Sequence, residues 1–594
     1  MRFKILVFIL MVSYTGGAFG QSDSSKAKEF YQSLKRKADR NPATLLLYKI
    51  VFNVPDEAEL DSILESPGFF GDRIIRNINI NTREPFGTSL HDTSVNTYST
   101  LQKAGNALHF RTRSRAIENL LVFESGEKLD MLKIEESERL IRSSGFIRDV
   151  QIKIKPIDKD SADVYVETRD HWTFKASATV TSNQTRTKFT SYDLFGMGHR
   201  FSNELTWLKG ESRLLKPYLE GYYLAPSVAG SFASAKLSYK LKEDNRSIQF
   251  DIDRPFVSPL AEWAGGLTVS RYLKNDSLRL TKSTYAPFMK EGSTYGGWLA
   301  KSFMLRPGKS MEERSTRLVI SMAFASDEPT QLNTSDLIAR EILSTKKTAL
   351  TSIGISSRSY VMDKYLFQFG EDEDVPSGRK IQITSGYDFG SYSNRYYIGG
   401  SAAAGGYIRN AFYASCHLDF GTFLKYGNKQ DEALKANLFT FSPLVNVGKW
   451  RIRFIGEMNY VKFTNQLYYR PLNLQQDRLL PGYRSGTPEG LERFGLNTTA
   501  VLFNQFEWLG FKFTPLIYGG AGVVKDDNNR LFNSTWIGVW GGGLAVSNKF
   551  LAQSDFKIIL AVFSNQNLPN RLGSISAWQY SFRDFDFTKP EVLY

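Results

Sequence analysis

The sequence predicts a mostly β protein, in which a transmembrane antiparallel β-barrel of about 16 strands follows a small α+β domain. Three observations lead to this prediction. Segments of alternating apolar and polar residues recur from residue 171 onward. Residues 71–170 combine strand-like and helix-like patterns. No run of 18 or more apolar residues follows residue 20, so no segment there is a candidate membrane-spanning helix.

The N-terminus has the pattern of a secretory signal peptide over residues 1–20. Arg2 and Lys4 precede the apolar run 5–12, and small residues lead to Gly20. No cysteine follows the expected cleavage site, so we expect an exported chain without a lipoprotein anchor. Residues 21–70 are predicted to be helical and basic, and they serve either as a docking element for a periplasmic partner or as a brace for the next domain.

Composition limits the kinds of site that this chain can build. The single cysteine, Cys416, excludes an intrachain disulfide, and with His417 beside it a metal site or a nucleophile is a minor alternative to simple packing. We predict no cofactor, no metal and no catalytic residues. The net charge is +14, with the basic excess in residues 171–594, which suits attraction of anionic lipopolysaccharide or acidic polypeptides. Nucleic acid is not expected, because no groove-reading or base-stacking motif accompanies the charge.

Residues 71–170 are expected to fold in the order β-α-α-β-β. Alternating strands are predicted from Arg73, from Asp149 and from Asp163, and helical spacing is predicted within 111–143. In the phrase Ser143-Ser-Gly-Phe-Ile-Arg-Asp-Val150, Gly145 is expected to end the last helix in a left-handed conformation. The pattern resembles a POTRA domain, the polypeptide-transport-associated module, with residues 81–110 as a long polar insertion.

Residues 171–594 are predicted to form the barrel. A segment of ten alternating apolar and polar residues, long enough to cross a bilayer, begins at Trp172. Similar segments are 236–241, 247–252, 265–270, 317–322, 380–387, 437–441, 449–456, 511–517 and 556–562. Counts of about 14 or 18 strands fit the length nearly as well as 16. A closed barrel is expected because hydrocarbon offers no hydrogen-bond partner, so every backbone N–H and C=O group within it must be paired with another strand.

Four phrases, in order along the chain, resemble the superfamily that contains BamA, TamA and FhaC. The POTRA-like module runs directly into the barrel through Val164-Tyr-Val-Glu-Thr-Arg-Asp-His-Trp172. Asp193-Leu-Phe-Gly-Met-Gly-His-Arg-Phe201 matches an N-x-F-G-x-G phrase, with Asp193 in place of asparagine. Asp251-Ile-Asp-Arg-Pro-Phe256 matches a recurrent strand ending, and Glu371-Asp-Glu-Asp-Val-Pro-Ser-Gly378 resembles an E-D-[IV]-P-x-G loop.

The resemblance also implies a loop that folds into the lumen. Its tip would be Leu480, Pro481, Gly482, Tyr483 and Arg484, in which Pro481 stands where the family has arginine. The acid that pairs with that arginine in the family is replaced by Gly520, so both partners of the buried ion pair are missing together. Arg484 is then either a substitute lumenal contact or a solvated loop cation.

The C-terminus departs from the usual amphipathic last strand, because Pro590 cannot donate a hydrogen bond within a sheet. We predict a last strand from Ser574 to about Asp586. The lateral seam would then join the first strand, with Trp172, Phe174 and Ala176, to the last strand, with Trp578, Tyr580 and Phe582 on one face.

The resemblance implies a Gram-negative outer-membrane protein with its N-terminal domain in the periplasm, which assists insertion, assembly or translocation of polypeptides. Its partners would be unfolded client proteins, outer-membrane lipids, lipopolysaccharide and periplasmic accessory proteins. A passive outer-membrane channel or a lipid-handling barrel is the alternative. A hydrolase is not favoured, since no G-x-S-x-G phrase is present.

Overall fold

The computed structural model describes residues 73–593 apart from short gaps. The gaps are 87–89, 91–99, 181–183, 209–215, 306–313, 368, 371, 391–393, 410, 481–482, 484–487, 505, 509–510, 526–528, 549–555, 565–571 and 577–581. The predicted signal peptide and N-terminal helical segment therefore lie outside the described residues. The chain divides into two compact units, residues 1–65 with 443–452 and residues 66–442 with 453–594. In the first unit, β18 (Val445–Val447) pairs antiparallel with the start of β19 at residues 450–452.

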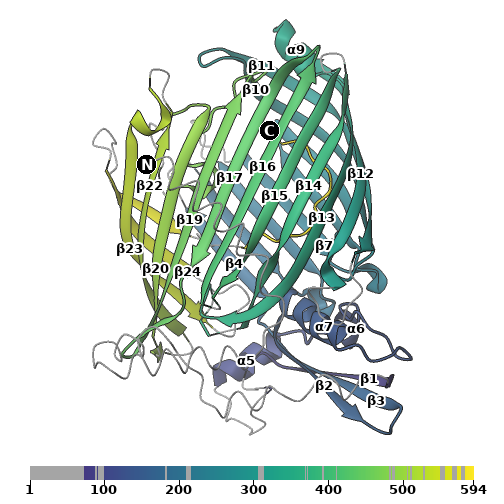
Figure 1. Ribbon diagram of the computed structural model, residues 1–594. Helices are drawn as coiled ribbons and strands as arrows, with labels where there is room; N and C mark the ends of the chain where they lie inside the picture. The colour runs from purple at the N-terminus through teal and green to yellow at the C-terminus, as the bar shows by residue number, and fades with distance from the viewer. Residues whose placement is uncertain are drawn as a thin grey trace. The chain divides into compact units, whose positions relative to one another are not determined.

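An α+β domain occupies the N-terminal part of the second unit (Figure 1). Its elements are β1 (Ile74–Arg83), α5 (Thr100–Leu108), α6 (Ser114–Glu118), α7 (Met131–Ser143), β2 (Ile147–Pro156) and β3 (Ser161–Asp170). The sheet order is β1-β3-β2, with β3 parallel to β1 and antiparallel to β2. Among the described residues, no helix is both long enough and apolar enough to cross a membrane.

Helix α7 packs on this sheet through one apolar stripe. Asp130 caps its first turn by accepting a hydrogen bond from the Leu132 amide at 3.0 Å. Ile134 and Ile141 are buried against Val164 and Val166 of the central strand β3. The helix ends before Gly145, whose φ of +80° is left-handed, as expected from the sequence.

The predicted helical region 111–143 is not one continuous stretch. Residues 125–129 instead run along β1, where the Gly126 amide donates to the Ile75 carbonyl at 2.7 Å and the Ile75 amide donates to the Glu127 carbonyl at 2.9 Å. Helical spacing of apolar residues holds only in α7. The extended segment forms because it satisfies the free edge of β1.

The rest of the second unit is a large antiparallel sheet of about 20 strands. Its strands are β4 (Phe174–Val180), β5 (Gln184–Ser191), β6 (Arg200–Leu208), β7 (Lys216–Ala225), β8 (Ser234–Lys242), β9 (Asn245–Arg254), β10 (Trp263–Arg279), β11 (Tyr285–Met304), β12 (Arg317–Asn333), β13 (Lys346–Lys364), β14 (Asp372–Gly390), β15 (Arg395–Ile408), β16 (Phe412–Lys425), β17 (Asn428–Phe441), β19 (Trp450–Thr464), β20 (Glu492–Phe503), β21 (Glu507–Trp508), β22 (Phe511–Val524), β23 (Trp536–Asn548), β24 (Phe556–Phe563) and β25 (Leu572–Ser576). A short helix, α9 (Leu337–Leu343), joins β12 to β13.

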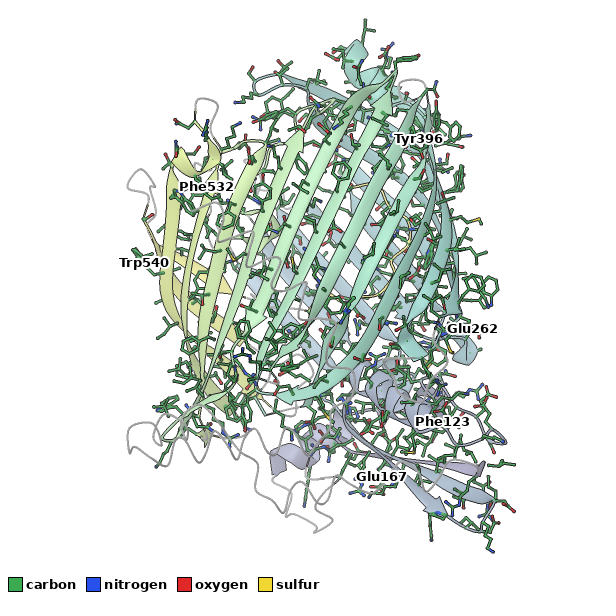
Figure 2. All side chains as sticks on the ribbon, viewed as in Figure 1. Phe123, Glu167, Glu262, Tyr396, Phe532 and Trp540 are labelled. Atoms are coloured by element: carbon green, nitrogen blue, oxygen red, sulfur yellow. The ribbon has the colours of Figure 1, made fainter. Side chains whose placement is uncertain are left out.

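The curved sheet has an outer face that is apolar and an inner face that is polar. On β14, Ile381 and Ile383 point outward with 65% and 55% of their surface exposed, whereas Gln382 and Thr384 between them are 5% and 6% exposed. Figure 2 shows Trp540 of β23 on the same outer face. This pattern is the reverse of the one in a water-soluble sheet, where the polar face is the exposed one.

The predicted count of about 16 strands was too low. Strands such as β15 and β23 lack clear apolar–polar alternation because they are rich in glycine and alanine. One of these glycines, Gly405 of β15, lies under another segment of the chain, since a Cβ there would lie 2.6 Å from the Phe585 ring.

Replacement of Gly145 tests the end of α7. Gly145→Ala should destabilise the α+β domain by about 1 kcal/mol, because a Cβ disfavours the left-handed region. Gly145→Asn should cost less, since asparagine tolerates that region. Hydrogen exchange of the α7 amides in the full chain measures the free energy of opening; equal protection in all three proteins would contradict this account.

Candidate functional site

The turn between β5 and β6 holds the α+β domain to the sheet. Asp193 is fully buried; its two carboxylate oxygens accept hydrogen bonds from the Gly198 amide at 2.5 Å and from the Thr112 hydroxyl at 2.8 Å. A Cβ on Gly196 would lie 2.2 Å from the Arg111 carbonyl oxygen, so only glycine allows this close approach. The sequence phrase 193–201 is therefore a docking turn for the domain.

A buried histidine–aspartate pair supports the same contact. His109 Nε2 lies 2.8 Å from Asp170 Oδ2, which also accepts a hydrogen bond from the Thr112 amide at 2.9 Å. The Trp172 ring packs beside His109 and Phe174. These contacts fix the end of β3 against the start of β4, so the domain and the sheet are joined by a packed polar core and not by a single linker.

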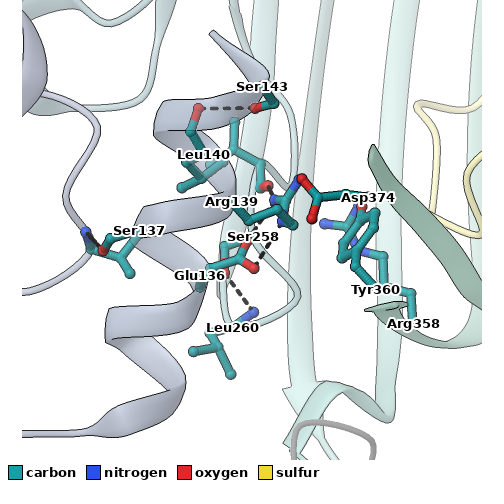
Figure 3. A network of polar contacts seen from close by, with 12 residues as sticks. Glu136, Ser137, Arg139, Leu140, Ser143, Ser258, Leu260, Arg358, Tyr360 and Asp374 are labelled. Carbon is teal, nitrogen blue, oxygen red and sulfur yellow. Dashed lines mark hydrogen bonds and ion pairs between the residues drawn. The ribbon is translucent and has the colours of Figure 1, made fainter. Parts of the chain in front are cut away.

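Helix α7 makes a second contact with the sheet (Figure 3). Arg139 pairs with Glu136 at 2.6 Å, donates to the Val257 carbonyl at 2.9 Å and lies 4.1 Å above the centre of the Tyr360 ring. One turn later, Arg142 forms two hydrogen bonds of 3.1 Å with the carboxylate of Asp374. Bidentate pairs of this kind fix orientation as well as distance.

These two contacts explain where the sequence phrases lie. Residues 193–201 contact the segment that leads into α6, residues 251–256 lead to the turn that accepts from Arg139, and Asp374 belongs to the phrase 371–378. The last phrase was expected to be a loop, but residues 372–378 begin strand β14. We refer to α7, the 193–198 turn and their partners Thr112, Val257, Tyr360 and Asp374 as the joint.

The described part of the loop between β19 and β20 folds onto the inner face. Leu474, Leu479 and Leu480 are buried in one cluster with inner residues of β22 to β24. Gly495 and Gly522 leave room for the loop, since a Cβ on either would lie less than 3 Å from a leucine side chain of the loop. The loop therefore fills space inside the curved sheet.

A buried arginine on the strand wall holds this loop. Arg493 of β20 is fully buried; its guanidinium lies 2.5 Å from Asp477 Oδ2 and 3.0 Å from Asn459 Oδ1, and it donates to the carbonyls of Asn473 and Gln476 at 2.8 and 3.1 Å. The family's ion pair joins an arginine on the loop to an acid on a strand, and Pro481 and Gly520 replace these two residues here. Arg493 and Asp477 form an ion pair between the same two parts with the charges exchanged, the arginine on the strand and the acid on the loop. The sequence signal was an arginine at an inner position of β20.

The C-terminal segment, residues 582–593, also lies on the inner face and is not a strand. Phe585 is fully buried and stacks on His417 of β16, with ring centres 5.4 Å apart. Asp584 accepts hydrogen bonds from Arg358 at 2.8 Å and from Tyr360 at 2.6 Å. Tyr360 is the same residue that Arg139 of α7 covers. The segment is therefore connected to the joint.

The predicted site residues have different outcomes. Leu480 and Tyr483 lie on the inner face, and the Tyr483 ring packs against Phe563 at 5.4 Å between centres. Pro481, Gly482 and Arg484 lie outside the described residues.

Of the predicted seam residues, Trp172 and Phe174 pack near the joint and Ala176 is exposed on β4. Trp578 and Tyr580 lie outside the described residues. The extension of the last strand to Asp586 is wrong, because β25 ends at Ser576 and residues 582–593 are not strand. Phe582 packs on the rings of Phe367, Tyr413, Phe439 and Phe441. It is therefore not part of a strand that pairs with β4, as the predicted seam required.

Metal and thiol chemistry find no support at Cys416 and His417. Cys416 is exposed on the outer face of β16, whereas His417 is buried on the inner face, so the two side chains point in opposite directions. Within the described residues, no group of three or more His, Cys, Asp and Glu side chains is arranged to hold a metal ion.

No protein-family model matches the chain, and no curated protein matches it. Among solved structures, BamA from Haemophilus ducreyi lacking POTRA domains 1–3 matches with 10% identity over 84% of this chain and 83% of that chain, at a TM-score of 0.36. CdiB from Escherichia coli matches with 10% identity over 94% and 98%, at a TM-score of 0.40. CdiB from Acinetobacter baumannii matches with 11% identity over 89% and 99%, at a TM-score of 0.33. BamA belongs to the superfamily that the sequence phrases resemble; TM-scores this low say nothing about what the chain does.

Asp193→Asn tests the docking turn through its pH dependence. Burial raises the pKa of Asp193 to about 6, although the hydrogen bonds from Gly198 and Thr112 oppose the shift. A raised carboxyl pKa means that the folded state binds the proton more tightly than the unfolded state, so stability falls as the pH rises from about 4 to about 6. Asparagine carries no charge; its oxygen can accept from the Gly198 amide, and its NH2 group can donate to the Thr112 hydroxyl oxygen in place of accepting from it. The variant should match the wild type near pH 4 and be more stable at pH 8, by at most about 3 kcal/mol.

Hydrogen exchange of residues 109–113 in the full chain, at pH 5 and pH 8, measures this difference. Asp244→Asn, in the exposed turn between β8 and β9, is the matched control and should change nothing. A pH-independent difference between Asp193→Asn and the wild type would contradict the assignment.

Arg493→Gln tests the attachment of the inner loop. Loss of the guanidinium leaves Asp477, Asn459 and two carbonyls without their donor, and we expect a loss of about 3 kcal/mol. Arg493→Lys should recover only part of it, because an ammonium cannot reach all four acceptors. Asp477→Asn should cost about 1 kcal/mol or less, since the Asp477 side chain is 63% exposed. Urea unfolding in lipid vesicles gives the three values, and equal losses for Asp477→Asn and Arg493→Gln would contradict the account.

Proposed function

We propose that this chain is an outer-membrane β-barrel protein of the BamA/TamA type, with a POTRA-like domain in the periplasm, that assists insertion or translocation of polypeptides. In this proposal the α+β domain receives an extended client. The client then enters the membrane at the seam between β4 and β25 or passes along the inner face. No bond is made or broken, so the chain needs no catalytic residues.

The reversed polarity of the sheet carries the membrane assignment. Large apolar side chains point outward on strand after strand, and they include Leu267, Leu299, Met322, Ile353, Ile381, Phe420, Ile517 and Leu560. Polar and charged side chains such as Lys290, Arg358 and Asn497 are buried on the inner face. An apolar surface of this extent needs a nonaqueous environment, which the hydrocarbon of a bilayer supplies.

The sheet order supports closure into a barrel with a seam between its first and last strands. It has β25 as the neighbour of β4, which would leave no open edge in the hydrocarbon. In the proposed function this seam opens for the client, which breaks the backbone hydrogen bonds between the two strands while the rest of the sheet stays paired.

The α+β domain has an edge suited to an extended client. β2 is an edge strand in the order β1-β3-β2, and it carries the exposed side chains of Lys153 and Lys155. A client segment that adds a strand to this edge would gain main-chain hydrogen bonds, and acidic residues would suit the lysines. The joint would transmit the position of the bound client to the sheet.

The alternative function is a passive channel or a lipid-handling barrel. It is less well supported, because the loop before β20 and the C-terminal segment both occupy the inner face. Lipids and lipopolysaccharide would contact the outer face in either case, and periplasmic accessory proteins would meet the α+β domain.

Ile381→Lys tests the membrane assignment. A lysine on the apolar outer face should cost about 2–4 kcal/mol of folding free energy in lipid vesicles if that face meets hydrocarbon. Tyr426→Lys is the control, since this residue lies in the turn between β16 and β17 and is 93% exposed. Similar small losses in both variants would contradict a lipid-facing position for β14.

A disulfide across the seam tests the insertion function. In a Cys416→Ser background, Ala176→Cys of β4 is combined in turn with cysteine at Ser574, Ile575 or Ser576 of β25. Oxidation in intact outer membranes should stop the assembly of client barrels, and reduction should restore it. Unimpaired assembly with the seam cross-linked would overturn insertion through the seam and favour passage along the inner face or passive conduction.

A second disulfide controls for cross-linking as such. Ala402 of β15 and Leu418 of β16 are direct partners in the sheet, far from the seam in strand order. Cysteines at these two positions should leave client assembly intact when oxidised. Loss of assembly here would mean that cross-linking itself is harmful.

A further inference from the structure

The C-terminal segment is held on the inner face by side chains and not by strand pairing. Within the described residues, its hydrogen bonds to the wall through backbone groups are a long one of 3.5 Å from Gln382 to the Thr588 carbonyl and one of 3.0 Å from the Leu593 amide to the Tyr397 hydroxyl. A segment attached in this way can leave without breaking the sheet. It is bound as a peptide ligand would be.

The wall has a groove that fits this segment. Four glycines on four successive strands line it: Gly354, Gly378, Gly405 and Gly421. A Cβ on these residues would lie 2.8 Å from Phe587, 3.2 Å from Phe585, 2.6 Å from Phe585 and 3.0 Å from Leu593, respectively. Any side chain at these positions would therefore narrow the groove. The four glycines leave the space that the C-terminal segment occupies.

Aromatic positions of the segment enter separate pockets along the groove. Phe582 sits among four aromatic rings, of which Phe367 is the nearest at 4.9 Å between centres. Phe585 stacks on His417, and Phe587 packs with Phe256 and Val319 in an apolar cluster. Phe585 and Phe587 are almost fully buried. The pockets select large flat apolar side chains at fixed spacing.

Acidic positions between the aromatics meet a buried cation. The side chain of Arg358 is 6% exposed, and its guanidinium lies 2.8 Å from Asp584 and 3.4 Å from Asp586. Tyr360 donates to Asp584 and is covered by Arg139 of α7. Because a buried arginine is costly without acceptors, the groove requires acidic residues in whatever fills it.

We propose that this groove is a binding site for extended peptides with alternating aromatic and acidic residues, and that the chain's own C-terminal segment occupies it as an internal competitor. This inference names the class of client segment that the proposed function would handle. It rests on the proposed function in one respect, namely that a client passes along the inner face. The pattern to be recognised is that of Phe582-Arg-Asp-Phe-Asp-Phe587.

The proposal is tested with the purified full chain in detergent and a fluorescent synthetic peptide with the sequence of residues 582–593. The tethered segment competes at an effective concentration of about millimolar, so the wild type should bind the peptide weakly. Asp584→Asn/Asp586→Asn in the protein weakens the internal competitor, and binding should tighten by at least about tenfold, equivalent to about 1.4 kcal/mol. Adding Arg358→Gln to this double variant should abolish that gain.

Two controls keep the result interpretable. Phe585→Ala weakens the internal segment without touching the ion pairs, and it should also tighten binding of the free peptide. A peptide with asparagine at both aspartate positions should bind none of the proteins well. Equal binding of the two peptides, equal binding by the wild type and both weakened variants, or no binding by folded weakened variants would each overturn the proposal. Peptide binding in detergent is independent of client assembly, so its failure alongside a working seam would reject this inference and leave the proposed function standing.

Discussion

The structure depends on the pairing of a buried arginine, Arg358, with two acids of the C-terminal segment. A sheet with an apolar outer face must place its polar groups inside, and each of them then needs a partner. Arg358 meets this requirement by binding the segment 582–593 and the Phe256 carbonyl. Tyr360 extends the contact to Arg139 of α7, so the wall, the segment and the α+β domain share one polar network.

This network relates the domain to the inner face in a way that suits transport. The joint fixes α7 at the point where the C-terminal segment is anchored, and Arg493 fixes the loop before β20 by similar chemistry. Both inner segments are held by arginine–aspartate pairs that a competing acidic peptide can replace. β4 and β25, the first and last strands of the large sheet, neighbour each other in the sheet order. The proposed function uses an interior segment that a client can displace and a seam that opens, and a passive channel needs neither property.

Much of this fold was predictable from the sequence, and the failures have physical reasons. The strands at both ends of the α+β domain and the left-handed Gly145 follow from local patterns, although the domain has three helices, α5, α6 and α7, where two were predicted. The strand count was too low because it was estimated from the length of the chain with long connections assumed, whereas short turns join many of the strands. The last strand was predicted to reach Asp586 because Trp578, Tyr580 and Phe582 alternate as in a strand, and such alternation does not distinguish a strand from a segment that is held by its side chains. The pair of Arg493 and Asp477 was missed because the arginine was expected on the loop and the acid on a strand. Here the arginine is on a strand and the acid is on the loop, so neither stands at the position that the family phrase would mark.

The most direct test of the central claim is a distance measurement between spin labels in proteoliposomes. One label is placed at Thr588→Cys in the C-terminal segment and the other at Tyr426→Cys in the turn between β16 and β17, in a Cys416→Ser background. The account predicts one narrow distance distribution for this protein and a broad distribution once Asp584→Asn and Asp586→Asn are added. A broad distribution before those two changes, or no response to them, would contradict a segment seated on the inner face by Arg358.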